Sequence, residues 1–330
     1  MRKHSAIIIL ALALLTAILF VVDIAVGAVN IPLSELLGSL LGEESGATDI
    51  VVKIRLPRTI VALLAGVALS VSGLQMQVLF RNPLAGPYVL GVSAGASLGV
   101  ALFLLGAPLL GFTATTFTSL GTAGAAWVGA AAVLLIVVAL ARKVKDIMVI
   151  LILGIMLSSA VGSVVEIMQY FSNEASLKSY VVWTMGSLGD VTMSQLAIVA
   201  PIIVVGIILS VAAIKPMNML LFGERYATSM GLNTRRTRIL ILSSTTLLAG
   251  TITAFCGPIG FVGIAAPHIA RMMMRSADHR ILLPATIFVG GIMMLASDIV
   301  AKALTLPINT ITALLGIPVV IYIVSRNRTL

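Results

Sequence analysis

The stretch Lys53-Ile-Arg55-Leu-Pro57-Arg58 is followed by an apolar helical pattern that begins near Leu63 and ends at Phe80. A sharp break comes next, Arg81-Asn82-Pro83-Leu84-Ala85-Gly86-Pro87, and then a glycine- and serine-rich apolar segment over 91–99. Cations therefore flank a run that is long enough to cross about 30 Å of hydrocarbon as a helix. This pattern predicts a transmembrane helix, and the side on which each basic cluster lies bears directly on function.

The composition extends this prediction to the whole chain. Of the 330 residues, 59% are hydrophobic and only 10% are charged. Soluble domains carry about 25% charged residues, so this chain has too few charges to cover a globule of its size. Apolar runs of membrane-spanning length recur from end to end, without the short alternating strands of a barrel. We predict an all-α polytopic membrane protein with a single transmembrane domain over 1–330.

The apolar runs predict about ten transmembrane helices. The third run is short and glycine-rich, and the eighth contains Pro258 and Pro267, so we expect it to be bent or broken. The first run is longer than the core of a signal peptide, and we expect it to be retained as a helix. The predicted spans are 5–27, 58–80, 88–106, 118–141, 147–170, 195–214, 238–256, 257–275, 281–301 and 309–325.

The basic residues are distributed unequally between the two sides. Ten spans place both termini on one side, and by the positive-inside rule we expect that side to be cytoplasmic. Cationic cytoplasmic loops then explain the net charge of +9 without nucleic-acid binding. The cations on the predicted inner side are Arg2, Lys3, Arg81, Arg142, Lys143, Lys145, Lys215, Arg225, Arg235, Arg236, Arg238, Arg271, Arg275, Arg280, Arg326 and Arg328.

Five cations remain on the outer side, and three of them cluster at Lys53, Arg55 and Arg58. Arg58 lies at the predicted start of a helix, where the helix dipole disfavours a cation. The residues alone leave two interpretations open: the side chains reach lipid headgroups, or they form a docking surface for an acidic partner. A fourth outer cation, Lys302, is four residues after Asp298 and can pair with it on one helical face.

A weak internal repeat supports a transporter. Leu63-Leu-Ala-Gly66 with Ser72-Gly73 resembles Leu247-Leu-Ala-Gly250 with Cys256-Gly257. The two copies lie on spans that run in opposite directions, which is the inverted topology common in transporters.

The longest predicted inner loop, about 215–237, contains a short amphipathic helix. Gly223 can begin it, Glu224 is favourable in its first turn, and Gly231 can end it in a left-handed conformation. Such a helix can lie on lipid or bind in a groove on a partner.

No chemistry of its own is visible in this chain. None of its lysines follows a glycine, so the phosphate-binding loop of ATPases is absent, and energy from ATP must enter through another chain. The three histidines are scattered near the predicted inner side and do not indicate a metal site or an enzyme. Intramembrane acids can relay ions, so an ion-coupled secondary transporter that acts without an ATPase is the alternative. These acids are Asp23, Glu166 and Asp298.

The order and spacing of the motifs resemble the FecCD family of ABC-importer permeases, which take up ferric siderophores, haem or cobalamin. The resemblance covers nearly the whole chain. Its motifs are Arg55-Leu-Pro-Arg58, Asn82-Pro-Leu-Ala85, Leu90-Gly-Val-Ser93, Lys215-Pro-Met-Asn218, the Gly223–Leu232 loop, Gly260-Phe-Val-Gly263, Asp278-His-Arg280, Asp298-Ile-Val-Ala301, Leu306-Pro-Ile308 and Leu315-Gly316.

The resemblance implies an inverted-repeat importer permease that is not itself an enzyme and holds no cofactor. Its expected partners are a second copy of itself, two ABC ATPase subunits that bind ATP and Mg, and a periplasmic or lipid-anchored substrate-binding protein. The expected location is the bacterial inner (cytoplasmic) membrane, with both termini cytoplasmic. The sequence does not indicate which chelate is carried.

The resemblance also implies roles for particular residues. Lys302 stands where cobalamin-importing members have arginine, so docking and an internal pair with Asp298 both remain open. Three small or polar positions on the fifth span can face the pathway, although helix packing is the favoured interpretation. The implied sets are docking by Arg55, Arg58 and Lys302; ATPase coupling by Gly223, Glu224, Ala227, Met230, Gly231 and Leu232; and pathway lining by Ser158, Ser159 and Gly162.

Overall fold

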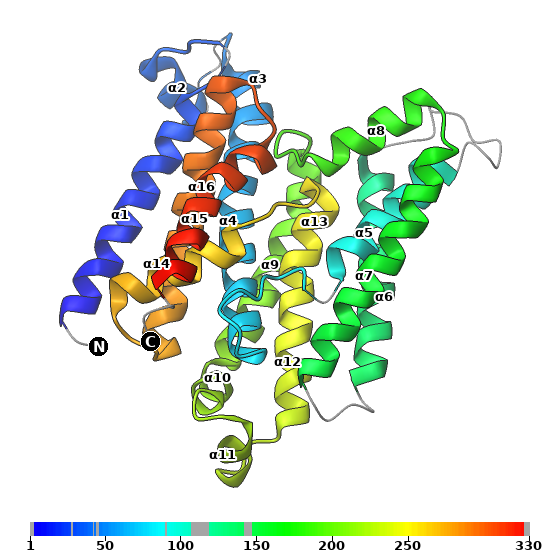
Figure 1. Cartoon of the computed structure of the whole chain (residues 1–330). Coiled ribbons are helices and arrows are strands. Elements are labelled where there is room, and N and C mark those ends of the chain that lie inside the picture. The colour runs from blue at the N-terminus through cyan, green and yellow to red at the C-terminus, as the bar shows by residue number, and fades with distance from the viewer. Residues whose placement is uncertain are drawn as a thin grey trace.

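The computed structural model describes residues 3–27, 29–41, 43, 46–89, 91–106, 119–141 and 147–326. The regular secondary structure of these residues is helical, and the long helices lie side by side with their connections at two opposite ends (Figure 1). Some residues that entered the sequence predictions lie outside the described part: Arg2, Leu90, Arg142, Lys143, Lys145 and Arg328.

Within the described residues, ten helical segments correspond to the ten predicted spans. Seven continuous helices are long and apolar enough to cross a membrane, and the third, eighth and tenth segments are shorter, as predicted for the third and eighth. The segments are α1 (Lys3–Ala25), α4 (Leu56–Leu79), α5 (Val92–Ala101) with η2 (Leu102–Gly106), α6 (Ser119–Ala141), α7 (Ile147–Tyr170), α9 (Met193–Ala212), α12 (Thr234–Thr245) with η5 (Thr246–Gly250) and α13 (Thr251–Cys256), α14 (Val262–Met274), α15 (His279–Leu304) and α16 (Ile308–Arg326).

Shorter helices lie at the two ends of the bundle. The helices α2 (Leu33–Leu40), α3 (Thr48–Ile50) and η1 (Val51–Arg55) lead into α4 at one end. The helices α10 (Ile214–Leu220) and α11 (Glu224–Ser229) lie at the other, toward which the first residues of α1 and the last residues of α16 also point (Figure 1). We call these the α2 end and the α11 end.

The sequence prediction missed short helices, among them α2, α10 and the longer α8 (Glu174–Thr184). The helix α8 follows α7 at the α2 end (Figure 1). The side chain of Asn173 accepts a hydrogen bond from the backbone N–H of Ser176 (2.9 Å), which is a typical N-cap. Asn173 followed by Glu174 was the available signal, but α8 is too short to be detected as a membrane span.

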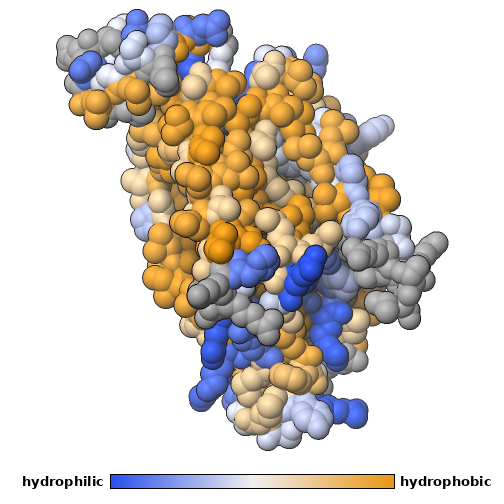
Figure 2. All heavy atoms as spheres, turned by 90° about the vertical axis from the view of Figure 1, so that its left-hand side faces the viewer, coloured by the Kyte–Doolittle hydropathy of each residue, from blue (hydrophilic) through white to orange (hydrophobic). Residues whose placement is uncertain are grey.

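The hydropathy of the surface agrees with a membrane protein. Figure 2 shows a broad apolar band between two ends that carry the hydrophilic residues. Large apolar side chains are exposed along α1 and α7, as is expected where a helix faces lipid or another subunit.

The helix α4 lies at the centre of the bundle because small residues let two other helices approach it closely. A Cβ atom on Gly66 would lie 2.2 Å from the carbonyl oxygen of Gly290 in α15. A Cβ atom on Gly73 would lie 1.7 Å from the carbonyl oxygen of Gly263 in α14. Only glycine permits these backbone contacts, which are typical of helix packing in membranes.

The Gly66–Gly290 contact sets the register between α4 and α15, which run in opposite directions (Figure 1). Arg58 lies eight residues before Gly66, and Asp298 lies eight residues after Gly290. At 1.5 Å per residue both are about 12 Å along the helices from the contact, on the same side of it. The packing therefore brings Arg58 and Asp298 together near the α2 end.

The two copies of the proposed internal repeat lie on α4 and on the η5–α13 segment. Figure 1 shows α4 running from the α2 end toward the α11 end, and α12 through α13 running back. Their opposite directions agree with an inverted repeat, while the equivalence of the individual residues stays a prediction.

Candidate functional site

The first candidate site is an ion-pair cluster at the α2 end. The guanidinium of Arg58 donates to Asp298 through Nη2 (2.7 Å to Oδ1) and Nε (3.1 and 3.2 Å to the two oxygens). The Asp298 side chain is fully buried, whereas 29% of the Arg58 side chain is exposed. Arg58 thus connects a buried carboxylate with the molecular surface.

Lys302 lies behind this pair and joins two acids. Its Nζ is 2.9 Å from Asp298 Oδ2 and 2.9 Å from Asp23 Oδ2, and only 6% of its side chain is exposed. Thr59 donates to the same oxygen of Asp23 (2.6 Å). The predicted Asp298–Lys302 pair is confirmed, and the cluster connects α1, α4 and α15.

Arg55 is buried at the end of α1. Its Nη1 donates to the carbonyl oxygens of Ile24 (3.0 Å) and Ala25 (2.8 Å), and its Nη2 donates to that of Val29. A cation is favourable at the C-terminus of a helix, where carbonyl groups lack intrahelical partners. Lys53, by contrast, is exposed and pairs with Asp49 (2.8 Å).

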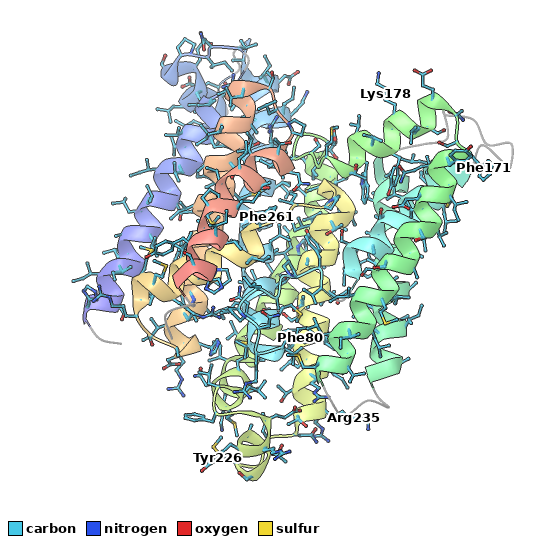
Figure 3. All side chains as sticks on the ribbon, in the orientation of Figure 1. Phe80, Phe171, Lys178, Tyr226, Arg235 and Phe261 are labelled. Atoms are coloured by element: carbon cyan, nitrogen blue, oxygen red, sulfur yellow. The ribbon has the colours of Figure 1, made fainter. Side chains whose placement is uncertain are left out.

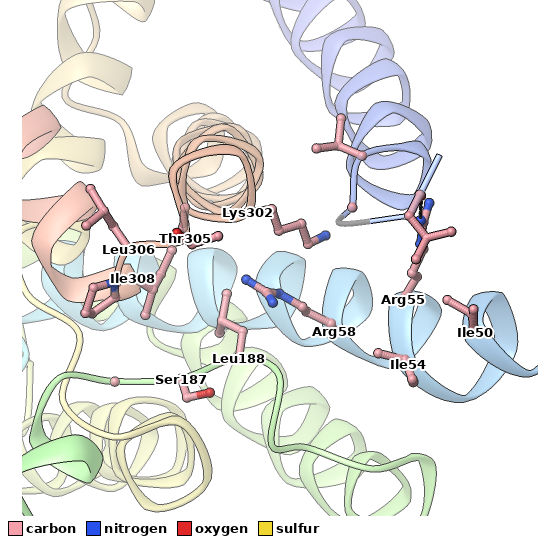
Figure 4. A pocket seen from close by; sticks show the side chains of 16 residues that line it. Ile50, Ile54, Arg55, Arg58, Ser187, Leu188, Lys302, Thr305, Leu306 and Ile308 are labelled. Carbon is pink, nitrogen blue, oxygen red and sulfur yellow. Dashed lines mark hydrogen bonds between the residues drawn. The ribbon is translucent and has the colours of Figure 1, made fainter. Parts of the chain in front are cut away.

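A cavity of about 560 Å³ brings the three predicted docking residues together. In Figure 4 the guanidinium of Arg58 extends from α4 into the space bounded by α15 and the segment at Ser187 and Leu188. Three cations among largely apolar walls are suited to a carboxylate. The lining residues are Val26, Gly27, Val29, Ile50, Ile54, Arg55, Arg58, Gly186, Ser187, Leu188, Ala301, Lys302, Thr305, Leu306, Pro307 and Ile308.

The second candidate site is α11, at the opposite end. The short helix predicted from Gly223 and Gly231 is confirmed, because α11 spans Glu224–Ser229. Gly223 (φ +96°) and Gly231 (φ +88°) both have positive φ, which favours glycine. The N–H groups of Gly231 and Leu232 bond to the carbonyls of Thr228 and Ala227, the Schellman pattern that ends a helix.

One face of α11 is anchored to the rest of the chain and the other is exposed. Ala227 is fully buried, and Glu224 forms an ion pair with Arg238 of α12 (2.5 Å). Tyr226 and the preceding Phe222 are 69% and 71% exposed, and Tyr226 lies at the tip of the molecule (Figure 3). Large apolar side chains exposed beyond the membrane-spanning region indicate a binding surface. Leu221 and Met230 are also exposed there.

A hydrogen-bonded joint fastens the α10–α11 segment to α15. Asn218 of α10 donates to Asp278 (2.7 Å) and accepts from the backbone N–H (2.9 Å) and Nδ1 (2.6 Å) of His279. The N–H of Arg280, followed by the amide of Asn218, holds the pKa of Asp278 below its ordinary value. Sequence reasoning noted both motifs but assigned them no role.

The predicted pathway residues lie on α7. Ser158 and Ser159 donate to carbonyls one turn earlier, those of Gly154 (2.8 Å) and Ile155 (3.1 Å). Ser159 is exposed, and a Cβ atom on Gly162 would meet nothing within 4 Å. Both positions can therefore face a second subunit, a passing cargo or lipid.

The residues that the structure describes contain no group of three or more His, Cys, Asp or Glu side chains placed to hold a metal ion.

Comparison with known proteins agrees with this architecture. The model of the FecCD transport family matches residues 15–326. The chain is 34% identical over 281 residues to the hemin transport system permease HmuU of Yersinia pestis, covering 83% of each protein. It is 38% identical over 280 residues to the vitamin B12 import system permease BtuC of Escherichia coli, covering 84% of this chain and 83% of that one.

A solved structure shows the same fold. An inward-facing conformation of a metal-chelate type ABC transporter superposes with a TM-score of 0.83 at 27% identity, covering 97% of this chain and 99% of that one. Sequence, helix arrangement and length therefore agree, and the chain belongs to the FecCD transport family.

Proposed function

We propose that this chain is the membrane-spanning permease subunit of an ATP-driven ABC importer that moves a metal chelate into the cell. The observation that carries the proposal is the match of the family model to residues 15–326. Relatives that transport hemin and vitamin B12, and a metal-chelate type structural neighbour, support a chelate as cargo. Ferric siderophore, haem and cobalamin are the candidate cargoes.

The chain itself performs no chemistry in this proposal. Two ABC ATPase subunits bind ATP and Mg and hydrolyse ATP, and α11 is the coupling helix that fits against them. Its exposed Tyr226 and Met230 supply the contact, while buried Ala227 and the Glu224–Arg238 ion pair tie it to the permease. The two ends of the helix are defined by positive φ at Gly223 and Gly231 and by the hydrogen bonds of Gly231 and Leu232.

A periplasmic or lipid-anchored substrate-binding protein delivers the chelate at the α2 end. The cavity lined by Arg55, Arg58 and Lys302 is the proposed docking site for acidic side chains of that protein. Opposite charges steer such an encounter and fix its orientation more than they add affinity.

We place the chain in the bacterial inner membrane with both termini and α11 in the cytoplasm. The positive-inside rule supports this orientation, because most of the basic residues fall on that side. A homodimer would supply the translocation pathway, and α7 is a candidate for its lining. Ser159 is exposed, and nothing in the described chain lies within 4 Å of the Cβ position of Gly162.

Affinity purification of the tagged chain from its native membrane in mild detergent tests the proposal. We expect an ATPase subunit in equal stoichiometry, together with a substrate-binding protein that binds the purified complex. A chain that purifies without any ATPase and transports its cargo under an ion gradient would instead establish the secondary transporter.

A further inference from the structure

Arg58 has two hydrogen-bonding edges, and the structure uses only one of them. The edge formed by Nε and Nη2 is occupied by Asp298, at 2.7–3.2 Å. The other edge is formed by Nη1 and Nη2 of a side chain that lines the cavity, and Nη1 donates to no group within the described part of the chain. A guanidinium can accept a carboxylate on each edge in the same plane.

The other two cations that line the cavity, Lys302 and Arg55, already form hydrogen bonds and ion pairs within the protein. Lys302 bonds to Asp298, Asp23 and the carbonyl of Asp23, and it is nearly inaccessible. Arg55 uses Nη1 on the last carbonyls of α1 and Nη2 on the carbonyl of Val29, which follows α1. A partner's carboxylate would have to break these bonds to reach either cation, whereas Arg58 requires no such exchange.

Asp298 itself is held rigidly. It is fully buried on α15, and Lys302 holds its second oxygen at 2.9 Å. The packing of Gly66 on Gly290 fixes the two helices that carry Arg58 and Asp298. The orientation of the Arg58 guanidinium is therefore determined by backbone packing and by an ion pair, before any partner arrives.

We propose that Asp298 is a positioning residue, which holds Arg58 by its inner edge so that the Nη1–Nη2 edge receives a carboxylate of the binding protein. Lys302 acts through Asp298, as its counter-ion, and does not touch the partner. This inference rests on the proposed function and refines its docking site.

The residues that line the cavity indicate the chemistry of the partner. The lining includes apolar side chains as well as Arg58, among them Ile54, Leu188 and Leu306. The occupant that fits is a glutamate or aspartate whose neighbouring side chains are apolar, because these can cover the cavity walls while the carboxylate binds the arginine.

The variant Asp298→Asn distinguishes two effects that Asp298 can have on docking: positioning of the Arg58 guanidinium and a change in the local charge. It removes a negative charge beside Arg58, so simple electrostatic attraction predicts tighter binding of an acidic partner. Positioning predicts weaker binding, because an amide NH2 group in place of Oδ2 cannot accept from Arg58 Nε (3.2 Å) or from Lys302 (2.9 Å). The arginine is then held less firmly and must be ordered on docking. Ordering one long side chain corresponds to a loss of about three- to tenfold in Kd.

The measurement is the Kd between the substrate-binding protein recovered with the native complex and the permease–ATPase complex in nanodiscs. At about 0.5 M salt the Debye length is only about 4 Å, so long-range attraction is screened and contact geometry dominates. We expect Asp298→Asn to weaken docking under these conditions. An unchanged or tighter Kd would overturn the inference, while a wild-type complex that binds no such protein would instead defeat the docking part of the proposed function.

Three further variants complete the test. Arg58→Lys keeps the positive charge but lacks the planar guanidinium that donates two parallel hydrogen bonds, and it should weaken docking about tenfold. Lys302→Gln added to Asp298→Asn should cause no further loss, whereas an additional loss would show that Lys302 contacts the partner. Lys53→Gln, which removes an exposed cation on the same side, is the matched control and should leave the high-salt Kd unchanged. Melting temperatures of all variants in detergent separate docking effects from misfolding.

Discussion

Asn218 and His279 are 61 residues apart in the sequence, yet the side-chain oxygen of Asn218 accepts two hydrogen bonds from His279, at 2.9 Å and 2.6 Å. Asn218 lies on α10, directly before the proposed coupling helix. His279 is the first residue of α15, a helix of 26 residues whose other end carries Asp298. The pair therefore connects the proposed ATPase-binding end of the protein with the helix that reaches the proposed docking cavity.

Replacing Asn218 with alanine should uncouple ATP hydrolysis from transport. The substitution removes three hydrogen bonds, each with a net value of about 1 kcal/mol, between α10 and the start of α15. We expect uptake per ATP hydrolysed to fall about tenfold while the ATPase subunits stay bound. Parallel assays of hydrolysis and uptake in proteoliposomes measure this ratio, and a ratio equal to that of the wild type would rule out the joint as a coupling element.

The substitution Ala227→Pro tests the coupling helix. It removes the bond from the N–H of Ala227 to the carbonyl of Gly223 and introduces a ring inside a six-residue helix, at a cost of about 3 kcal/mol. We predict loss of ATP-driven uptake. Ser229→Ala, on the same helix, removes only a local bond to the carbonyl of Tyr226 and serves as the control. Normal uptake by the proline variant would contradict the assignment of α11.

Gly66→Val tests the packing that aligns α4 with α15. The new side chain would meet the backbone of Gly290, which cannot move aside as a flexible side chain can. We expect a loss of about 3 kcal/mol in the free energy of unfolding, the upper end for an overpacked core, measured by thermal unfolding in detergent. Gly162→Val is the matched control, since nothing lies within 4 Å of its Cβ position in the described chain. Equal stability of the two variants would show that the Gly66 contact is not needed.

The double variant Arg55→Glu with Arg58→Glu should weaken docking of the binding protein and leave the permease–ATPase complex assembled. Both residues lie where η1 meets α4, at the α2 end, and α11 lies at the opposite end of the bundle (Figure 1). Pull-down of the two partners in one experiment compares the effects directly. Because Arg55 also fastens the end of α1, its single variant should lower the melting temperature more than the Arg58 variant does. Unchanged docking in the double variant would exclude the outer cluster as the docking site.

The sequence was sufficient for features that depend on local patterns. Hydropathy identified the long spans, Gly223 and Gly231 marked the ends of α11, and the four-residue spacing predicted the Asp298–Lys302 pair. Each of these follows from side chains a few residues apart on one helix.

Features that depend on how distant helices pack could not be predicted in the same way. Arg58 meets Asp298 across 240 residues, because the Gly66–Gly290 contact sets the register of two helices. Lys302 meets Asp23 across 279 residues for a similar reason, since α1 and α15 are neighbours in the bundle. The family resemblance therefore suggested docking roles for Arg55 and Lys302, and the spacing anticipated the bond between Lys302 and Asp298. The bonds of Arg55 near the end of α1 and of Lys302 to Asp23 were not anticipated.

The central claim is that ATP drives import through this permease, and uptake into proteoliposomes tests it most directly. The complex purified with its ATPase and binding protein is reconstituted with ATP inside the vesicles, and hemin, cobalamin and a ferric siderophore are offered outside in turn. We predict uptake of one of these chelates with ATP, and none with a non-hydrolysable analogue, at any imposed ion gradient. Uptake that follows a proton or sodium gradient and ignores ATP would contradict the claim.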